Sequence, residues 1–177
     1  EEAERERIRK EKEEREERER QEKEAEQERI RLEVQAKETS SLLIQVIQEA
    51  KQNHPNNRKY QRALAMIDVD RFQLDEESSQ EWIHRLESLK EKCLALQKEA
   101  QAEAEEKLEY EIQQKRSSQL RETIAQEDLQ DSLFQQFAQQ AEKHLQKHDK
   151  ESSKEWGTRL DSIEKEFLEQ REQATLR

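Results

Sequence analysis

The chain has 177 residues, of which 44% are charged and 30% hydrophobic, and its formal net charge is -11 at pH 7. An ordinary globular domain has roughly 25% charged and 45 to 50% apolar residues, which argues against one compact core of normal size. One Gly and one Pro leave too little turn chemistry for a fold rich in strands and hairpins. The remaining composition is dominated by strong helix formers. We therefore predict an all-α fold with narrow apolar seams.

The acidic balance also limits the classes of partner. A face for nucleic acid would have to act against the field of the whole protein, so nucleic acid is not an expected partner. No run of about 18 apolar residues is present, so we expect no membrane insertion. Cys93 is the only cysteine and cannot form an internal disulfide, which favours a reducing, cytoplasmic setting. We expect a protein partner.

Residues 1–38 carry alternating charges at helical spacing. Opposite charges recur four residues apart, as in Glu6 with Lys10 and Glu11 with Arg15. Each such pair contributes about 0.2 to 0.5 kcal/mol to an isolated helix. The segment resembles ER/K-type single α-helices, and the resemblance implies a stiff spacer. A disordered charged tail is the alternative, but interleaved signs favour the helix.

A ten-residue pattern occurs twice and contains both tryptophans of the chain. It reads ESSQEWIHRL at 77–86 and ESSKEWGTRL at 151–160. In both copies a serine stands three residues before a glutamate, which is a capping-box signal for the start of a helix. A second match, offset by 77 positions, relates Ser40-Ser41-Leu42-Leu43 to Ser117-Ser118-Gln119-Leu120. An internal repeat of this kind predicts two copies of one structural unit.

Apolar residues follow each capping box at alternating steps of four and three, as in bundle-forming helices. We expect helices at 39–53, 57–70, 78–100, 116–127, 131–147 and 152–177. The predicted domains are a charged single-helix spacer (1–38), a first three-helix unit (39–100), a helical connector (101–115) and a second three-helix unit (116–177). The predicted fold is thus a long charged helix leading into two tandem antiparallel three-helix bundles that share a continuous connecting helix.

This arrangement resembles short spectrin repeats, in which a shared helix joins successive bundles. The resemblance is one of architecture only. The units here are shorter, and the tryptophan opens the third helix, whereas the hallmark tryptophan of spectrin lies in the first. No binding residue is therefore carried over from that family.

Six residues are candidate core anchors or protein contacts: Trp82, Trp156, Arg85, Arg159, Phe134 and Phe137. The seam spacing favours a core role for both tryptophans, and interface hot spots are the alternative. Each arginine stands three residues after a tryptophan and could stack on or flank its ring.

No residue pattern indicates catalysis or a cofactor. His144 and His148 lie four residues apart and form half of a metal site, but their polar surroundings favour a solvated helix face. Cys93 occupies a seam position that is Phe167 in the second copy, which indicates a core thiol and not a nucleophile. We predict no catalytic residue, no metal, no cofactor and no enzyme activity.

Two functions remain. The first is a structural and interaction module, in which a stiff spacer and a helical-bundle rod position a protein-binding surface within a larger protein. The alternative is a regulatory or chaperone-type helical lever or lid, attached to a nucleotide-driven or other catalytic domain outside this sequence. Residues 1–38 lack a sustained heptad seam, which favours a monomer over a coiled-coil dimer. The oligomeric state and the partner's identity stay open.

Overall fold

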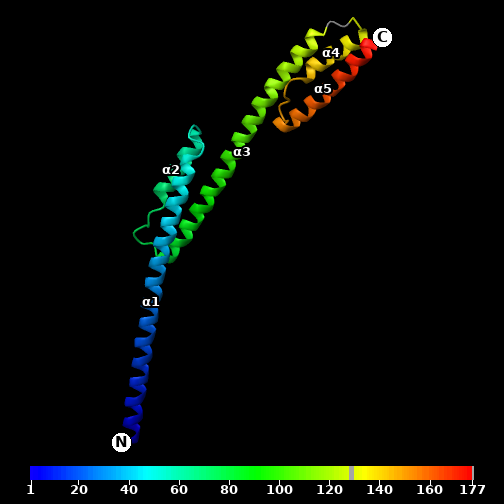
Figure 1. The fold of residues 1–177 in the computed structure, drawn as a ribbon. Helices are drawn as coiled ribbons and strands as arrows, with labels where there is room; N and C mark the ends of the chain where they lie inside the picture. Colours follow the sequence, from blue (N-terminus) through cyan, green and yellow to red (C-terminus); the bar gives the residue numbers. More distant parts are fainter. Residues whose placement is uncertain (128–129, 177) are drawn as a thin grey trace. The chain divides into compact units, whose positions relative to one another are not determined.

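A computed structural model of the protein describes residues 1–127 and 130–176, and within these ranges it contains five helices and no strand (Figure 1). The all-α prediction is confirmed. The helices are α1 (Glu2–Gln52), α2 (Arg58–Asp70), α3 (Ser79–Gln126), α4 (Ser132–His144) and α5 (Ser153–Leu176). Arg177, which the predicted second unit includes, lies outside the described residues.

The chain divides into two compact units, Glu1–Ala100 and Gln101–Arg177. Unit 1 contains α1, α2 and the first part of α3, and unit 2 contains the rest of α3 with α4 and α5. Within each unit the middle helix runs antiparallel to the other two (Figure 1). Short connections between successive helices produce this up-down-up order.

Side-chain caps begin both middle helices. The Asn57 side chain accepts a hydrogen bond from the Tyr60 amide at 3.1 Å, and Asp131 accepts from the amides of Leu133 and Phe134 at 3.0 and 2.9 Å. Such caps satisfy amides that have no partner inside a helix. Before α2, the chain turns at His54, whose φ of 49° is left-handed.

The end of α4 differs from the sequence-based prediction, which extended this helix to residue 147. The helix ends at His144, and the following carbonyls accept bonds from side chains of α3 and α5. The helix predicted at 57–70 already indicated this earlier end. It corresponds to α2, which ends at Asp70, and Asp70 is the repeat counterpart of His144.

Each unit has its own apolar core. The buried core of unit 1 consists of Leu43, Ile47, Ala50, Tyr60, Leu64, Ile67, Leu86, Leu89, Cys93 and Ala100. That of unit 2 consists of Leu120, Ile124, Phe134, Phe137, Ala141, Leu145, Trp156, Leu160, Ile163 and Phe167. The Cys93 thiol is fully buried, and burial raises its pKa.

The N-terminal part of α1 is exposed along its whole length. Every residue from 1 to 31 is solvent-exposed, and burial in α1 begins with the partly buried Leu32 and the fully buried Ala36. Ion pairs one turn apart accompany this stretch, including Arg7–Glu4 at 2.9 Å and Arg15–Glu19 at 3.1 Å. Burial therefore starts slightly before the predicted boundary at residue 39.

Candidate functional site

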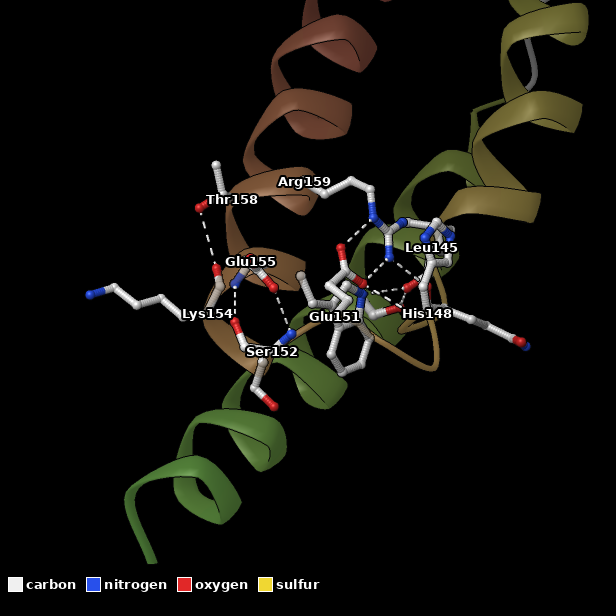
Figure 2. Close-up of polar contacts among 12 residues, drawn as sticks. Leu145, His148, Glu151, Ser152, Lys154, Glu155, Thr158 and Arg159 are labelled. Carbon is white, nitrogen blue, oxygen red and sulfur yellow. Dashed lines mark hydrogen bonds and ion pairs between the residues drawn. The ribbon is translucent and has the colours of Figure 1, made fainter. Parts of the chain in front are cut away.

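The repeated tryptophan and arginine hold the loop before the third helix of each unit. In unit 2, Arg159 Nε and Nη2 donate to the two carboxylate oxygens of Glu151 at 2.9 and 2.8 Å (Figure 2). Arg159 Nη2 also donates to the Gln146 carbonyl at 2.7 Å, and Trp156 Nε1 donates to the Leu145 carbonyl at 3.0 Å. Two consecutive carbonyls are thus bound by side chains of one helix. We call Glu151, Trp156 and Arg159 the loop clamp of unit 2.

Unit 1 has the same loop clamp, formed by Glu77, Trp82 and Arg85. Trp82 Nε1 donates to the Arg71 carbonyl at 2.9 Å, and Arg85 Nε and Nη2 each donate to a Glu77 carboxylate oxygen at 2.8 Å. Arg85 Nη2 also donates to the Phe72 carbonyl at 2.5 Å. Every one of these bonds has its counterpart 74 positions later. The loop clamp is therefore part of the repeated unit.

The two clamps differ at one nitrogen of the guanidinium group. Arg85 Nη1 donates to the Asp70 carbonyl. The buried Arg159 Nη1 has no partner among the described residues. The clamp of unit 2 is accordingly less completely satisfied than that of unit 1.

The predicted capping boxes are confirmed. Ser78 N donates to Glu81 Oε2 at 2.9 Å, and Glu81 N donates back to Ser78 Oγ at 3.2 Å. The same two bonds join Ser152 and Glu155, at 2.8 and 3.2 Å (Figure 2). Reciprocal capping satisfies two free amides at each helix start, so the serines have a structural role.

The arginine side chains, which were expected to stack on or flank the tryptophan rings, bind glutamate side chains. Their guanidinium groups bind the carboxylates of Glu77 and Glu151 in bidentate geometry, an arrangement that matches the shape of both groups. Sequence reasoning missed this pairing. The available signal was that both the glutamate and the arginine recur, eight residues apart, in each copy.

The arginines also set the acidity of their glutamate partners. Hydrogen bonds from Arg159 lower the pKa of Glu151 from 4.5 to about 2, and the His148 amide contributes to the same shift. Arg85 and the Leu74 amide have the same effect on the pKa of Glu77, which is also about 2. Both carboxylates are therefore ionised in the folded protein well below their ordinary pKa.

We expect the acid stability of unit 2 to depend on Glu151. Because its pKa is lower in the folded state, its contribution is complete above pH 4.5 and is lost as the pH falls toward about 2. Glu151→Gln should flatten the decrease in the thermal midpoint over this window. The midpoint is measured by Trp156 fluorescence in a Trp82→Phe background. The exposed control Glu166→Gln should keep the original slope, and an equal flattening by both substitutions would contradict the assignment.

The six candidate anchors do not share one site. Trp156, Phe134 and Phe137 are buried in unit 2, at 1%, 2% and 7% exposure. The Phe134 ring centroid lies 6.1 Å from those of both Phe137 and Phe167. Trp82 is only partly buried and lies against the core of unit 1. The tryptophans and phenylalanines thus contribute to two separate cores, while the arginines hold the loops beside them.

The connector predicted at 101–115 is exposed except at Glu109 and Gln113, yet some of its side chains contact α5 within unit 2. Glu106 Oε1 accepts bonds from Ser153 N and Oγ at 3.0 and 2.6 Å, and these bonds lower the pKa of Glu106. The Tyr110 ring centroid lies 5.7 Å from that of Trp156. Polar side chains of α3 therefore cap α5 and cover its first turn.

Gln113 and Gly157 form a close contact between α3 and α5. Gln113 is 7% exposed, and its Oε1 has no partner among the described residues. A Cβ added to Gly157 would lie 2.8 Å from Gln113 Nε2. The repeat places Ala36 and Ile83 at these two positions in unit 1, and both are buried. The larger side chain of the pair therefore belongs to the first helix in unit 2, as Gln113, and to the third helix in unit 1, as Ile83.

Unit 2 also has a shallow groove of about 580 Å³ beside α3 and α4. It is lined by Ile124, Ala125 and Ala138, with Arg121, Gln139, Glu142 and Lys143 around them. Ala138 is the repeat counterpart of Leu64, which is fully buried in unit 1. The loss of this larger side chain is consistent with a second unit that is less completely filled than the first.

The two histidines that form half of a metal-site pattern lie close to each other at the end of α4. The His144 and His148 ring centroids are 6.3 Å apart. Across residues 1–127 and 130–176, no group of three or more metal-ligating side chains is assembled. In the same ranges, no helix combines the length and apolar character needed to cross a membrane. Comparison with protein-family models, curated proteins and solved structures finds no match to this chain.

Proposed function

We propose that this protein is a structural and interaction module in which the N-terminal part of α1 is a stiff spacer for a protein-binding helical bundle. The observation that carries the proposal is the exposure of every residue from 1 to 31 in a helix that packs only further along. A helix with no buried face is suited to span a distance in water.

The internal repeat supports the spacer. The seam of α3 in unit 1 includes Leu86, Leu89 and Cys93, all buried. Positions 77 residues earlier hold Arg9, Lys12 and Glu16. This part of α1 therefore has charges where a bundle helix needs apolar side chains, and it cannot form the third helix of a preceding unit.

Ion pairs along the spacer supply the local stabilisation that packing does not. Those from Arg7–Glu4 to Arg31–Glu28 are all one turn apart, and their side chains are more than half exposed. Each exposed pair is weak, but overlapping pairs over many turns sustain a helix. Residues 2–31 would span about 44 Å at 1.5 Å per residue.

The two three-helix units supply the interaction part of the module. A net charge of -11 favours a protein partner over nucleic acid. The lone, buried Cys93 is compatible with the cytoplasm as the setting we propose. The test of the spacer is the distance between spin labels at positions 3 and 35 of the full chain, which should match a straight helix.

A further inference from the structure

Unit 1 exposes four large apolar side chains within nine consecutive residues. Met66, Val69, Phe72 and Leu74 are 67%, 72%, 59% and 63% exposed, and together we call them the 66–74 surface. Met66 and Val69 lie on one face of α2 because they are three residues apart. Arg71 keeps helical angles, with φ -74° and ψ -17°, so Phe72 follows near the next position on that face. Clustered exposed apolar side chains are typical of interaction sites.

The internal repeat shows that the fold does not need these apolar residues. Their counterparts in unit 2 are Gln140, Lys143, Gln146 and His148, which are also exposed. Unit 2 nevertheless has the same helix end, loop clamp and capping box as unit 1. The apolar character of the 66–74 surface is therefore specific to unit 1, and a binding role accounts for it.

Three exposed acidic residues lie next to this surface in the sequence, and the exposed Arg62 lies one turn before Met66 on α2. Asp70, Asp75 and Glu76 are exposed. The nearest basic residue, Arg71, is already engaged, because its Nε lies 2.9 Å from Asp68 Oδ1 and its guanidinium lies over the Phe72 ring. At the repeat position of Glu76, unit 2 has Lys150. The Asp75 position keeps its negative charge, as Asp149, and Asp70 is replaced by His144, so the acidic charge beside the surface is reduced in unit 2.

We infer that the 66–74 surface binds an amphipathic helix of a partner protein, whose apolar face is flanked by Lys or Arg. Such a helix would cover Met66, Val69, Phe72 and Leu74, while its cations would complement the acidic residues beside them. A second copy of this chain fits less well, because a two-fold contact would bring the same acidic residues together. The inference rests on the proposed protein-binding function and does not depend on the spacer.

The test uses the full chain and a fluorescein-labelled amphipathic peptide of Leu and Lys, about four helical turns long. Fluorescence anisotropy should show saturable binding to the native protein. The combined substitution Met66→Gln, Val69→Lys, Phe72→Gln and Leu74→His introduces the residues of unit 2 and should weaken binding about tenfold or more. The matched control Leu133→Gln with Leu168→Gln, at exposed positions of unit 2, should leave the affinity unchanged. Circular dichroism and Trp82 fluorescence establish that the variants are folded.

Two further measurements test the role of the acidic residues and the identity of the molecule that binds the 66–74 surface. Asp75→Asn with Glu76→Gln should weaken binding a few-fold at low salt and reduce its salt dependence. The inference is overturned if the native chain does not bind the Leu/Lys peptide, if the four-residue variant binds it equally well, or if a Leu/Glu peptide binds as tightly. It is also overturned if sedimentation shows a dimer that the four-residue variant abolishes. None of these outcomes changes the expected spin-label distance in α1, so the two proposals can fail separately.

Discussion

Trp156→Ala is expected to lower the free energy of unfolding of unit 2 by about 3 to 5 kcal/mol. The Trp156 side chain is 1% exposed, and its Nε1 donates to the Leu145 carbonyl. Truncation leaves a cavity and removes one of the bonds that hold the loop. Trp82→Ala should lower the free energy of unfolding of unit 1 by a smaller amount, because Trp82 is only partly buried. Its Nε1 makes the equivalent hydrogen bond, to the Arg71 carbonyl.

Urea unfolding followed by circular dichroism measures both losses. In each variant the remaining tryptophan reports the other unit by fluorescence, so an effect confined to one unit can be recognised. Trp156→Phe is the matched control, since it keeps an aromatic ring but removes the bond to Leu145. A larger loss for Trp82→Ala than for Trp156→Ala would contradict the burial found for the two rings.

The second large effect is expected at the contact of Gln113 with Gly157. Gly157→Ile should destabilise unit 2 by about 1 to 3 kcal/mol through overpacking, because even a Cβ there would lie 2.8 Å from Gln113 Nε2. Adding Gln113→Ala should recover this loss. The double variant reproduces the Ala36 and Ile83 pair of unit 1, and it removes the unpartnered Gln113 Oε1.

A double-mutant cycle measures this coupling from the unfolding free energies of the native chain, the two single variants and the double variant. The expected coupling is favourable, so the double variant should be more stable than the sum of the single effects predicts. Additive losses of stability would show that the side-chain volumes at positions 113 and 157 do not compensate for each other as the repeat implies.

Local signals were sufficient to predict the helices, except for the end of α4. The charge spacing of residues 1–38 and the two capping boxes each depend on residues close in sequence. The seam steps after Trp82 and Trp156 then indicated which faces are buried. Agreement among these signals explains why the all-α fold with a continuous α3 could be predicted.

Contacts between distant segments could not be predicted in the same way. The bond from Ser153 to Glu106 joins residues 47 positions apart, and nothing in the polar sequence of 101–115 distinguishes Glu106 from its neighbours. The unequal burial of Trp82 and Trp156 is also a tertiary effect, since Tyr110 lies against Trp156 while the matching position in α1 is Glu33.

The roles of the candidate residues depend on the loops they meet. Arg85 and Arg159 reach Glu77 and Glu151 because the loop carbonyls beside them also need donors. That requirement becomes visible only when the ends of α2 and α4 are known.

The most direct test of the proposed module is a spin-label distance in the full chain, with labels on Ala3→Cys and Gln35→Cys in a Cys93→Ala background. A straight helix places these positions about 48 Å apart. The control pair Glu38→Cys and Gln52→Cys, in the same helix where it packs in unit 1, should give about 21 Å at any salt concentration. We predict a narrow distribution near 48 Å at low salt that broadens at high salt, where surface ion pairs are screened. A broad distribution centred near 30 Å, typical of a flexible coil of this length, would contradict the spacer.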